Sequence, residues 1–294
     1  MPHRVEDLSV GAKIKFGAYS VSGEEPHKIA WIKVHHNNTL YNEFAEDILP
    51  FDAKEPLNPR VNRRNYGSNR YSVSNICGFI NSEQEDWFKK QSETDTPPTE
   101  EYLQDGNPGY KSKPGFLHFF QPWELEQILT SKIVTKLNSA DVVEDGDDTA
   151  KYDVAFQRVF LASRDNLFGE KFNEGEWWDY FSNYGKRSCE ASDACVQFSR
   201  ASDNLELDYD PACGYFLRTC HPDETCYVKR VDRYGECQNE VACDSETGLR
   251  VALVIDPNTL VSDEPDEDGY YQVLEGSSMA FDISEDEFLT LIKQ

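Results

Sequence analysis

The fold is predicted chiefly by two segments, Cys213-Gly-Tyr-Phe-Leu-Arg-Thr-Cys220 and Gly248-Leu-Arg-Val-Ala-Leu-Val-Ile255. Each is a short apolar run between more polar stretches, which is typical of a strand in a protein core. Each run also carries an arginine, Arg218 or Arg250, and an unpaired guanidinium there would cost several kcal/mol. We therefore expect both arginines to pair with buried carboxylates or carbonyls.

The first segment lies in a cysteine-rich stretch, because seven of the eight cysteines fall between Cys189 and Cys243. No two of them form a Cys-x-x-Cys pair, which disfavours a zinc ribbon or a thioredoxin-like motif. The N-terminus lacks the apolar core of a signal peptide, so we expect a cytoplasmic protein with reduced thiols at synthesis. The alternative is that the cysteines oxidise after assembly into a phage virion. No window approaches about 18 apolar residues, so no membrane insertion is predicted.

The charge of the chain excludes one class of partner. The sequence has 29 Lys and Arg against 54 Asp and Glu, a net charge of −25, and such a surface repels nucleic-acid phosphates. Acidic residues gather at 141–148 and 263–269, where we expect solvated loops. Calcium is a weak alternative for these loops, since they lack the Asp-x-Asp-x-Asp-Gly spacing of a calcium-binding loop.

Apolar patterning predicts an α+β protein of short strands. We expect strands near residues 10–17, 28–34, 154–163, 215–218, 226–231, 236–242 and 249–255, and helices near 76–88 and 122–130. Ser74 or Asn75 should cap the first helix, and residues 232–235 should form a hairpin turn. Because no internal repeat is found, we expect a single domain over 1–294. Residues 91–113 should form a surface loop or insertion, and 256–294 an acidic C-terminal extension packing on the domain.

Taken in order, several pieces resemble a family of uncharacterised bacterial and phage domains. They are Val10–Tyr19, Ile29–Trp31, Arg70–Ile76 with Phe79–Asn81, Val159–Ser163, Phe216–Arg218 and Gly248–Leu253. That family is related to C-type-lectin-like folds of the formylglycine-generating type. The family more usually has Trp-Leu-Arg where this chain has Phe216-Leu-Arg, and Gly-Val-Arg-Pro-Ala where this chain has Gly248-Leu-Arg-Val-Ala. Phe216 and Val251 therefore depart from the family pattern, and the run of cysteines is not part of it. The resemblance implies a single compact C-type-lectin-like domain with short antiparallel strands, two or three helices and long loops.

Such scaffolds hold loops that tolerate sequence change, and the resemblance implies a non-enzymatic recognition or structural module. Its setting would be a phage tail, fibre or capsid decoration, or a bacterial surface, with a protein or glycan partner and possible homo-oligomers. We expect the binding surface at Trp177, Trp178, Tyr180, Tyr184, Arg187 and Tyr209, since aromatic and arginine side chains are enriched at interface hot spots. The alternative is that the paired tryptophans belong to the core.

One enzymatic hypothesis comes from the stretch between Cys220 and Cys226, which is similar to the end of formylglycine-generating enzymes. Those enzymes resemble copper-dependent thiol oxidases, and the resemblance implies that the two thiolates would bind Cu(I) and activate oxygen. Five residues separate the two cysteines here. The alternative is that both thiols flank a turn and pack as small apolar groups.

No other pattern predicts catalysis or a metal site. The chain has no Gly-x-Ser-x-Gly, His-Glu-x-x-His, Walker or Gly-x-Gly-x-x-Gly motif. His35 and His36 stand beside a turn-like Asn-Asn pair, and nothing in the local spacing supplies a third metal ligand. We therefore expect these histidines to belong to a solvated turn.

Overall fold

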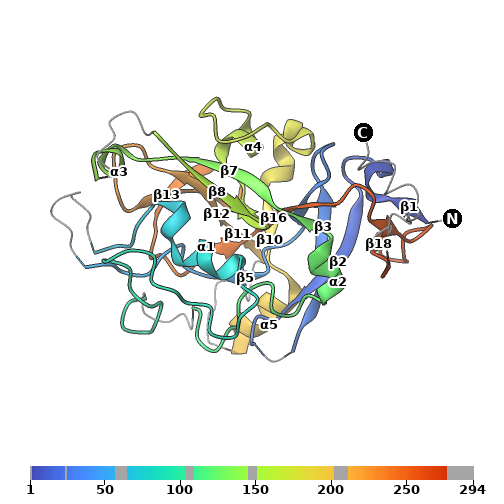
Figure 1. Cartoon of the computed structure of the whole chain (residues 1–294), viewed down its shortest axis with the longest axis horizontal. Coiled ribbons are helices and arrows are strands. Elements are labelled where there is room, and N and C mark those ends of the chain that lie inside the picture. Colours follow the sequence, from blue (N-terminus) through green and yellow to red (C-terminus); the bar gives the residue numbers. More distant parts are fainter. Residues whose placement is uncertain are drawn as a thin grey trace, which may run out of the picture.

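The computed structural model describes residues 2–23, 25–56, 65–103, 109–144, 151–201 and 211–276. This part of the chain is a mixed α/β structure with five short α-helices and many antiparallel strands in curled sheets (Figure 1). The predicted mixture of short strands and helices is confirmed, although the sequence predicted only two or three helices.

The larger sheet has seven strands and joins the beginning of the chain to its C-terminal third. In order they are β18 (Tyr270–Gln272), β2 (Lys13–Tyr19), β3 (His27–Lys33), β4 (Thr39–Asn42) and β16 (Val251–Ile255), followed by β6 (Ile128–Leu129) and β9 (Val159–Leu161), which both pair with β16. β18 is parallel to β2, and the other pairs are antiparallel. The strands expected near 10–17 and 28–34 are confirmed, whereas β4 was not predicted.

The second sheet has five strands and contains the first of the two diagnostic segments. Its order is β14 (Cys237–Val241), β13 (Tyr227–Val231), β12 (Tyr215–Cys220), β15 (Gly248–Leu249) and β5 (Asp47–Ile48). The expected turn is confirmed, because β13 and β14 pair from Val231 opposite Cys237. Three two-stranded ribbons complete the strands: β1 (His3–Arg4) with β17 (Leu260–Val261), β7 (Ser131–Lys136) with β8 (Tyr152–Gln157), and β10 (Cys189–Glu190) with β11 (Ala212–Cys213).

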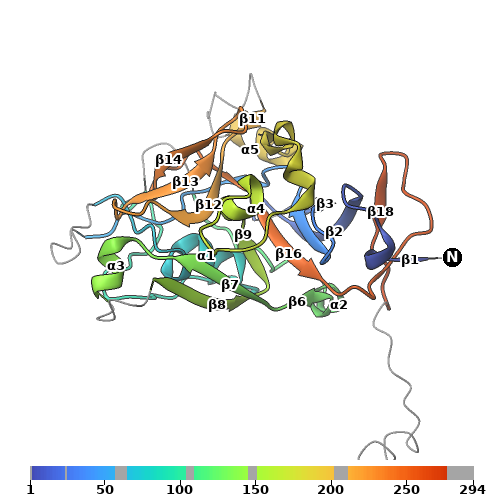
Figure 2. The same cartoon turned by 90° about the horizontal axis from the view of Figure 1, so that it is seen from above.

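The helices are short and lie in the connections. The α-helices are α1 (Asn75–Ile80), α2 (Pro122–Glu126), α3 (Ser139–Glu144), α4 (Arg164–Phe168) and α5 (Asp193–Ala201), and the 3-10 helices are η1 (Val5–Asp7), η2 (Tyr71–Val73), η3 (Asp179–Ser182) and η4 (Tyr184–Arg187). Figure 2 shows the β7–β8 ribbon and the β13–β14 hairpin on opposite sides of the molecule, with α1 and β9 between them.

Two helices end earlier than the apolar spacing predicts. Ser74 caps α1 as expected, accepting a hydrogen bond from the Cys77 backbone. The helix stops at Ile80 because the Asn81 side chain donates to the Cys77 carbonyl at 3.2 Å and to the Val159 carbonyl at 2.8 Å. α2 ends at Glu126 because the next residues pair with β16 instead.

A buried ion pair fixes the end of the segment that was predicted as a surface loop. Lys113 Nζ lies 2.6 Å from Asp47 Oδ2, and both side chains are almost fully buried. Tyr110 is also buried, and its hydroxyl donates to the Pro50 carbonyl at 2.6 Å. The described parts of 91–113 contain no helix or strand, but they are tied to the core.

The acidic C-terminal extension pairs with the N-terminal part of the chain at two places. β17 pairs with β1, and β18 adds to the edge of β2; residues 277–294 lie outside the described residues. In the described part of 263–269, Asp266 accepts backbone bonds from Asp268 and Tyr270.

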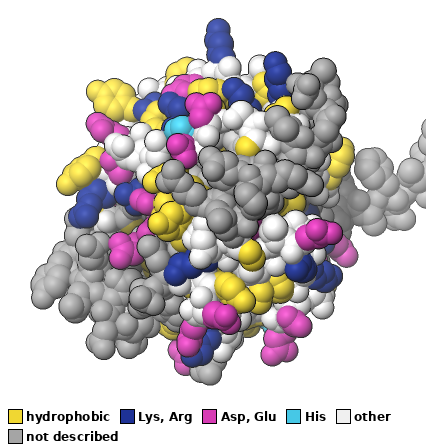
Figure 3. All heavy atoms as spheres, turned by 90° about the vertical axis from the view of Figure 1, so that its left-hand side faces the viewer, with side chains coloured by type: hydrophobic (Ala, Val, Ile, Leu, Met, Phe, Trp, Pro, Cys, Tyr) yellow, Lys and Arg dark blue, Asp and Glu magenta, His cyan; other side chains and the backbone are white. Residues whose placement is uncertain are grey.

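The other acidic cluster is only partly described, since residues 145–148 lie outside the described ranges. A solvated loop was wrong for Asp141, which is fully buried in α3 and accepts a hydrogen bond from Asn138. Among the described residues, no helix is long and apolar enough to cross a bilayer. Figure 3 shows one face on which acidic and basic side chains are interspersed.

Candidate functional site

A surface hollow of about 400 Å³ lies where β10 and the start of β16 meet the segment around η3 and η4. Its lining includes Glu43, Tyr180, Lys186, Cys189, Arg233 and Arg250. The full lining holds three cationic side chains, Lys186, Arg233 and Arg250, and two acidic ones, Glu43 and Glu190, although the whole chain carries a net charge of −25. The hollow is therefore locally more positive than the chain as a whole.

Arg250 gives the hollow its buried charge. The guanidinium carbon lies 4.3 Å from the centre of the Tyr41 ring and 5.0 Å from that of Tyr215. Nε donates to the Asn42 carbonyl at 2.8 Å, which confirms the carbonyl pairing expected for this arginine. Nη1, by contrast, is buried and has no hydrogen-bond acceptor among the described residues. Burial lowers the pKa of Arg250, but Cys189, Tyr215 and Tyr41 outweigh it and raise the pKa, so the side chain stays charged.

Unsatisfied polar atoms gather around this arginine. The hydroxyl of Tyr41 and the side-chain nitrogen of Asn42 are also buried without a hydrogen-bond partner among the described residues. Buried polar groups are nearly always hydrogen-bonded, and each exception calls for an explanation such as an ordered water or a ligand. The three atoms mark this region as a place where a polar group could be received.

Two thiols stand beside Arg250. Cys189 and Cys213 lie directly opposite each other on β10 and β11, and both are buried. Burial alone would raise the pKa of Cys189, but the hydrogen bond with Cys213 and the charge of Arg250 outweigh it and lower the pKa. The hydrogen bond with Cys189 and then burial raise the pKa of Cys213. The two pKa shifts have opposite directions, so Cys189 is the member of the pair that loses its proton first.

Exposed basic side chains line the hollow, and exposed aromatic side chains stand close to them in the sequence. Lys186 Nζ lies 4.0 Å from the centre of the Tyr180 ring, which is a cation–π contact. Tyr184 is 75% exposed and Tyr234 is 80% exposed. The turn that holds Tyr234 packs closely against the end of η4, since a side chain on Gly235, which has positive φ, would begin 3.1 Å from the Ser188 nitrogen.

The residues predicted as the binding surface lie in different parts of the structure. Tyr180 lines the hollow, and Tyr184 lies on η4, two residues before the lining residue Lys186. Arg187 stacks over Phe168 and donates to the Leu167 carbonyl, while Trp177 packs against Gly169, so both lie at the end of α4. Trp178 is 3% exposed and packs against Tyr41 and Phe181 in the core. Tyr209 lies outside the described residues.

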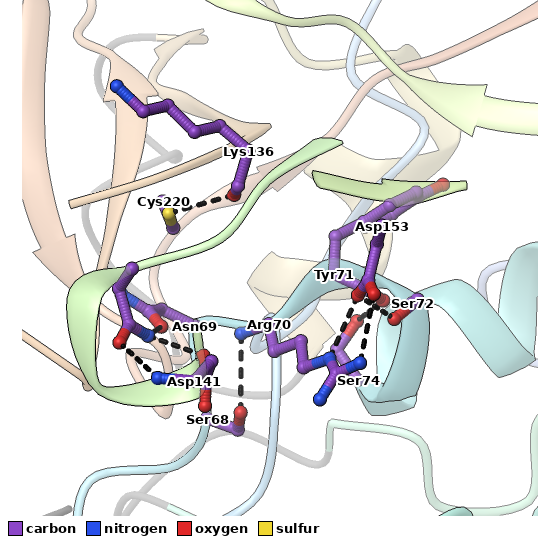
Figure 4. A network of polar contacts seen from close by, with 11 residues as sticks. Ser68, Asn69, Arg70, Tyr71, Ser72, Ser74, Lys136, Asp141, Asp153 and Cys220 are labelled. Atoms are coloured by element: carbon purple, nitrogen blue, oxygen red, sulfur yellow. Dashed lines mark hydrogen bonds and ion pairs between the residues drawn. The ribbon is translucent and has the colours of Figure 1, made fainter. Parts of the chain in front are cut away.

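The two cysteines of the enzymatic hypothesis are both buried. Cys220 donates to the Lys136 carbonyl at 3.1 Å, near the Arg70–Asp153 ion pair (Figure 4). Burial raises the pKa of Cys220 to about 12, so this sulfur is a protonated thiol at neutral pH. A protonated thiol is a poor ligand for soft metals, which bind the thiolate.

A larger cleft of about 930 Å³ lies on another face, lined by Trp87, Phe88, Pro97 and Phe119 among others. Its lysines already have partners: Lys111 pairs with Glu100, and Lys113 with Asp47. None of the buried polar atoms that lack partners in the described ranges belongs to a residue of its lining. The smaller hollow therefore carries the more specific chemistry.

The family described as domain of unknown function DUF6273 matches residues 44–257. The chain belongs to this family. No curated protein and no solved structure matches the chain.

The DUF6273 match contains most of the hollow, including Tyr180, Cys189 and Arg250, but Glu43 lies just before it. Sequence reasoning missed the thiol pair because 23 residues separate Cys189 from Cys213 and only strand pairing brings them together. A signal for Arg250 was present, since a charged residue in an apolar strand is unusual. No local pattern indicated that a hollow would reach it.

Proposed function

We propose that this chain is a non-enzymatic recognition module whose partner, a protein or a glycan, contacts the hollow around Arg250 with an anionic group such as a carboxylate. The observation that carries this proposal is the buried Nη1 of Arg250, which has no acceptor among the described residues. A planar guanidinium matches a carboxylate in geometry and charge.

The charges around the hollow support an anionic ligand. Glu43, one of the acidic side chains there, is engaged by Lys13 at 2.6 Å and by the Tyr270 hydroxyl at 2.7 Å. Its charge is thus partly compensated before a ligand arrives. Lys186 and Arg233 are exposed beside it, and rim charges of this kind act mainly on the rate of association.

The exposed aromatic residues support a partner larger than a free ion. Tyr184 and Tyr234, which are near the lining residues Lys186 and Arg233 in the sequence, present rigid, amphipathic surface, as binding loops commonly do. We further propose that the scaffold is C-type-lectin-like and that it serves in a phage virion or on a bacterial surface. Short strands, curled sheets and long connections support the scaffold. A surrounding block of tail or capsid genes would support the virion setting.

The proposal is tested with an array of neutral, sialylated and uronic-acid-containing glycans and with a displayed random-peptide library. We expect acidic ligands to be enriched, and we expect Arg250→Met to weaken their binding at least tenfold, since losing one partner of a buried charge pair costs about 2–5 kcal/mol. Lys186→Ala, at an exposed position, should slow association without affecting the fold. Lys132→Ala, on the exposed edge of β7, is the matched control.

Enrichment of neutral ligands only, or binding that Arg250→Met and Lys186→Ala leave unchanged, would contradict the anionic hollow. Absence of any ligand from both libraries would count against a recognition module. Circular dichroism of Arg250→Met must match that of the unmodified protein. If it does not, the binding measured for Lys186→Ala and Tyr184→Ala decides between the outcomes.

A further inference from the structure

Two histidines and an aspartate from distant parts of the chain converge beside the turn between β3 and β4. His35 Nδ1 lies 3.1 Å from Asp179 Oδ2, and His36 Nδ1 lies 3.2 Å from the same oxygen. One ligand atom of each of these three residues lies within 4.8 Å of the others. The third ligand that the local sequence could not supply thus comes from the first residue of η3, 143 residues after His36.

The backbone holds the two segments together without help from these side chains. The Tyr180 backbone nitrogen donates to the Val34 carbonyl at 3.1 Å, which joins η3 to the end of β3. On the other side of the turn, the Val34 nitrogen donates to the Thr39 carbonyl at 2.9 Å, and Asn38 adopts a left-handed φ of 64°. The cluster is therefore pre-organised by main-chain contacts on both sides.

His35 has an environment typical of a metal-binding histidine. Its side chain is only 4% exposed, and its Nε2 lies 3.2 Å from Glu176 Oε2. Its Nδ1 faces Asp179, yet it has no hydrogen-bond partner of acceptable geometry among the described residues. Metal-ligating histidines usually donate their other ring nitrogen to a carboxylate, which fixes the tautomer and the orientation of the ring. Glu176 is placed to do this for His35.

The position of Glu176 is itself supported by the fold. The side chain of Asn166 donates to the Glu176 carbonyl at 2.7 Å, and the Trp178 backbone nitrogen donates to the Asn166 carbonyl at 2.9 Å. Asn166 is buried in α4, so the segment before η3 is anchored to a helix on the core side. The Glu176 side chain is 79% exposed and can therefore adjust when a ligand binds.

We propose that His35, His36 and Asp179 form a zinc site, with Glu176 as the residue that orients His35. In a tetrahedral zinc site with bonds of about 2.0–2.2 Å, neighbouring ligand atoms are about 3.3–3.6 Å apart. The separations of 3.1 and 3.2 Å between the histidine nitrogens and Asp179 Oδ2 are slightly shorter, so a small outward movement of these side chains would admit the ion. Three protein ligands leave one position open for water or for an exogenous group.

The competing explanation is a metal-free ion-pair cluster in which the histidines donate Nδ1–H to the Asp179 carboxylate, as a neutral imidazole can do as well as a charged one. Zinc requires the other arrangement, in which each Nδ1 is deprotonated and faces the ion. The two explanations therefore differ in whether metal binds, and the site stands independently of the hollow at Arg250.

The test uses the full chain without an affinity tag, reduced and freed of metal. Calorimetric titration with Zn²⁺ should find one site per chain, and His36→Ala and Asp179→Ala should each weaken it at least tenfold. Glu176→Gln should weaken it by about 10–100-fold, the usual effect of removing a carboxylate that orients a ligand. His118→Ala, another exposed histidine, is the matched control and should bind as the unmodified protein does.

Co²⁺ provides a second readout that does not depend on affinity. We expect the intense visible bands of a tetrahedral ion, without the near-ultraviolet band of sulfur-to-cobalt charge transfer, and we expect His36→Ala to lose them. A sulfur band, or Zn²⁺ binding that Asp179→Ala leaves unchanged, would assign the metal to the cysteines and overturn the proposal. Absence of binding at 1 mM Zn²⁺, roughly the weak limit of useful affinity, would leave the ion-pair cluster as the explanation.

Discussion

Replacing Arg218 by methionine should lower the free energy of unfolding by about 3–5 kcal/mol, the usual cost of removing one partner of a buried charge pair. Arg218 is 2% exposed on β12. Its Nη1 donates to the Leu161 carbonyl at 2.6 Å and to Asn166 Oδ1 at 3.0 Å, and its Nη2 donates to the Glu174 carbonyl. Methionine fills similar volume but leaves these acceptors without their donor.

The Glu174 carboxylate adds a pH dependence to this loss. Burial raises the pKa of Glu174, and the charge of Arg218 opposes that rise. Without Arg218 the folded-state pKa should rise further, so the variant should lose more stability as the pH increases through that range. The measurement is denaturant unfolding followed by tryptophan fluorescence, in reductant, at pH 6 and pH 8.

The control is Arg158→Met. Arg158 pairs with Glu83 at 2.8 Å, and both side chains are more than one-third exposed. Exposed ion pairs contribute about 0–1 kcal/mol, so this variant should unfold almost as the unmodified protein does. If Arg218→Met costs no more than Arg158→Met, the reasoning about a buried guanidinium network is refuted.

Three further predictions concern the thiols and the buried acids. Protein unfolded without reductant should show eight reactive thiols, since the described residues, which include every cysteine, contain no disulfide; a count of six would indicate a disulfide, most simply between Cys189 and Cys213. Cys189 and Cys220 are both buried, so the pKa of each thiol should decide the order of labelling. Iodoacetamide should label Cys189, whose pKa is lowered, before Cys220, whose pKa is raised to about 12, and earlier labelling of Cys220 on peptide mass spectrometry would contradict the assignment. The free energy of unfolding should increase when the pH is lowered from 7.5 to 6. Burial raises the pKa of Asp52 and of Glu46, so the folded state binds more protons than the unfolded state in this range. The increase should persist in high salt, which screens repulsion between surface charges. Equal denaturation midpoints at the two pH values would show that these buried acids do not govern stability.

Local patterns predicted the strands that contain their own signal. Residues 215–218 and 249–255 are apolar runs, and they lie in β12, β15 and β16. β4 was not predicted because its four residues, Thr39–Asn42, follow directly on the histidine turn and form no separate apolar run. β7 carries two lysines and a partly exposed face, so its pairing with β8 depends on tertiary contacts that propensity does not report.

The candidate sites could be predicted only in part, because their residues meet across long sequence separations. Of the aromatic cluster near 177–187, Tyr180 lines the hollow, but the sequence could not show that Trp178 packs in the core. The turn histidines were visible, whereas Asp179 reaches them only through the main-chain contact between η3 and β3. The spacing of residues in the sequence reveals a site when one helix, strand or loop supplies all of its ligands. Both candidate sites here take their residues from several elements.

The pairing of β18 with β2 shows that the seven-stranded sheet extends beyond the residues that the family model matches. The match covers residues 44–257, yet the seven-stranded sheet takes β2, β3 and β4 from before it and β18 from after it. A fragment cut at those boundaries would leave one edge of β16 without its partner and expose unpaired backbone groups, which favours edge-to-edge aggregation. Expression trials on this chain should therefore keep both flanks together, and the same applies when it is fused to another protein.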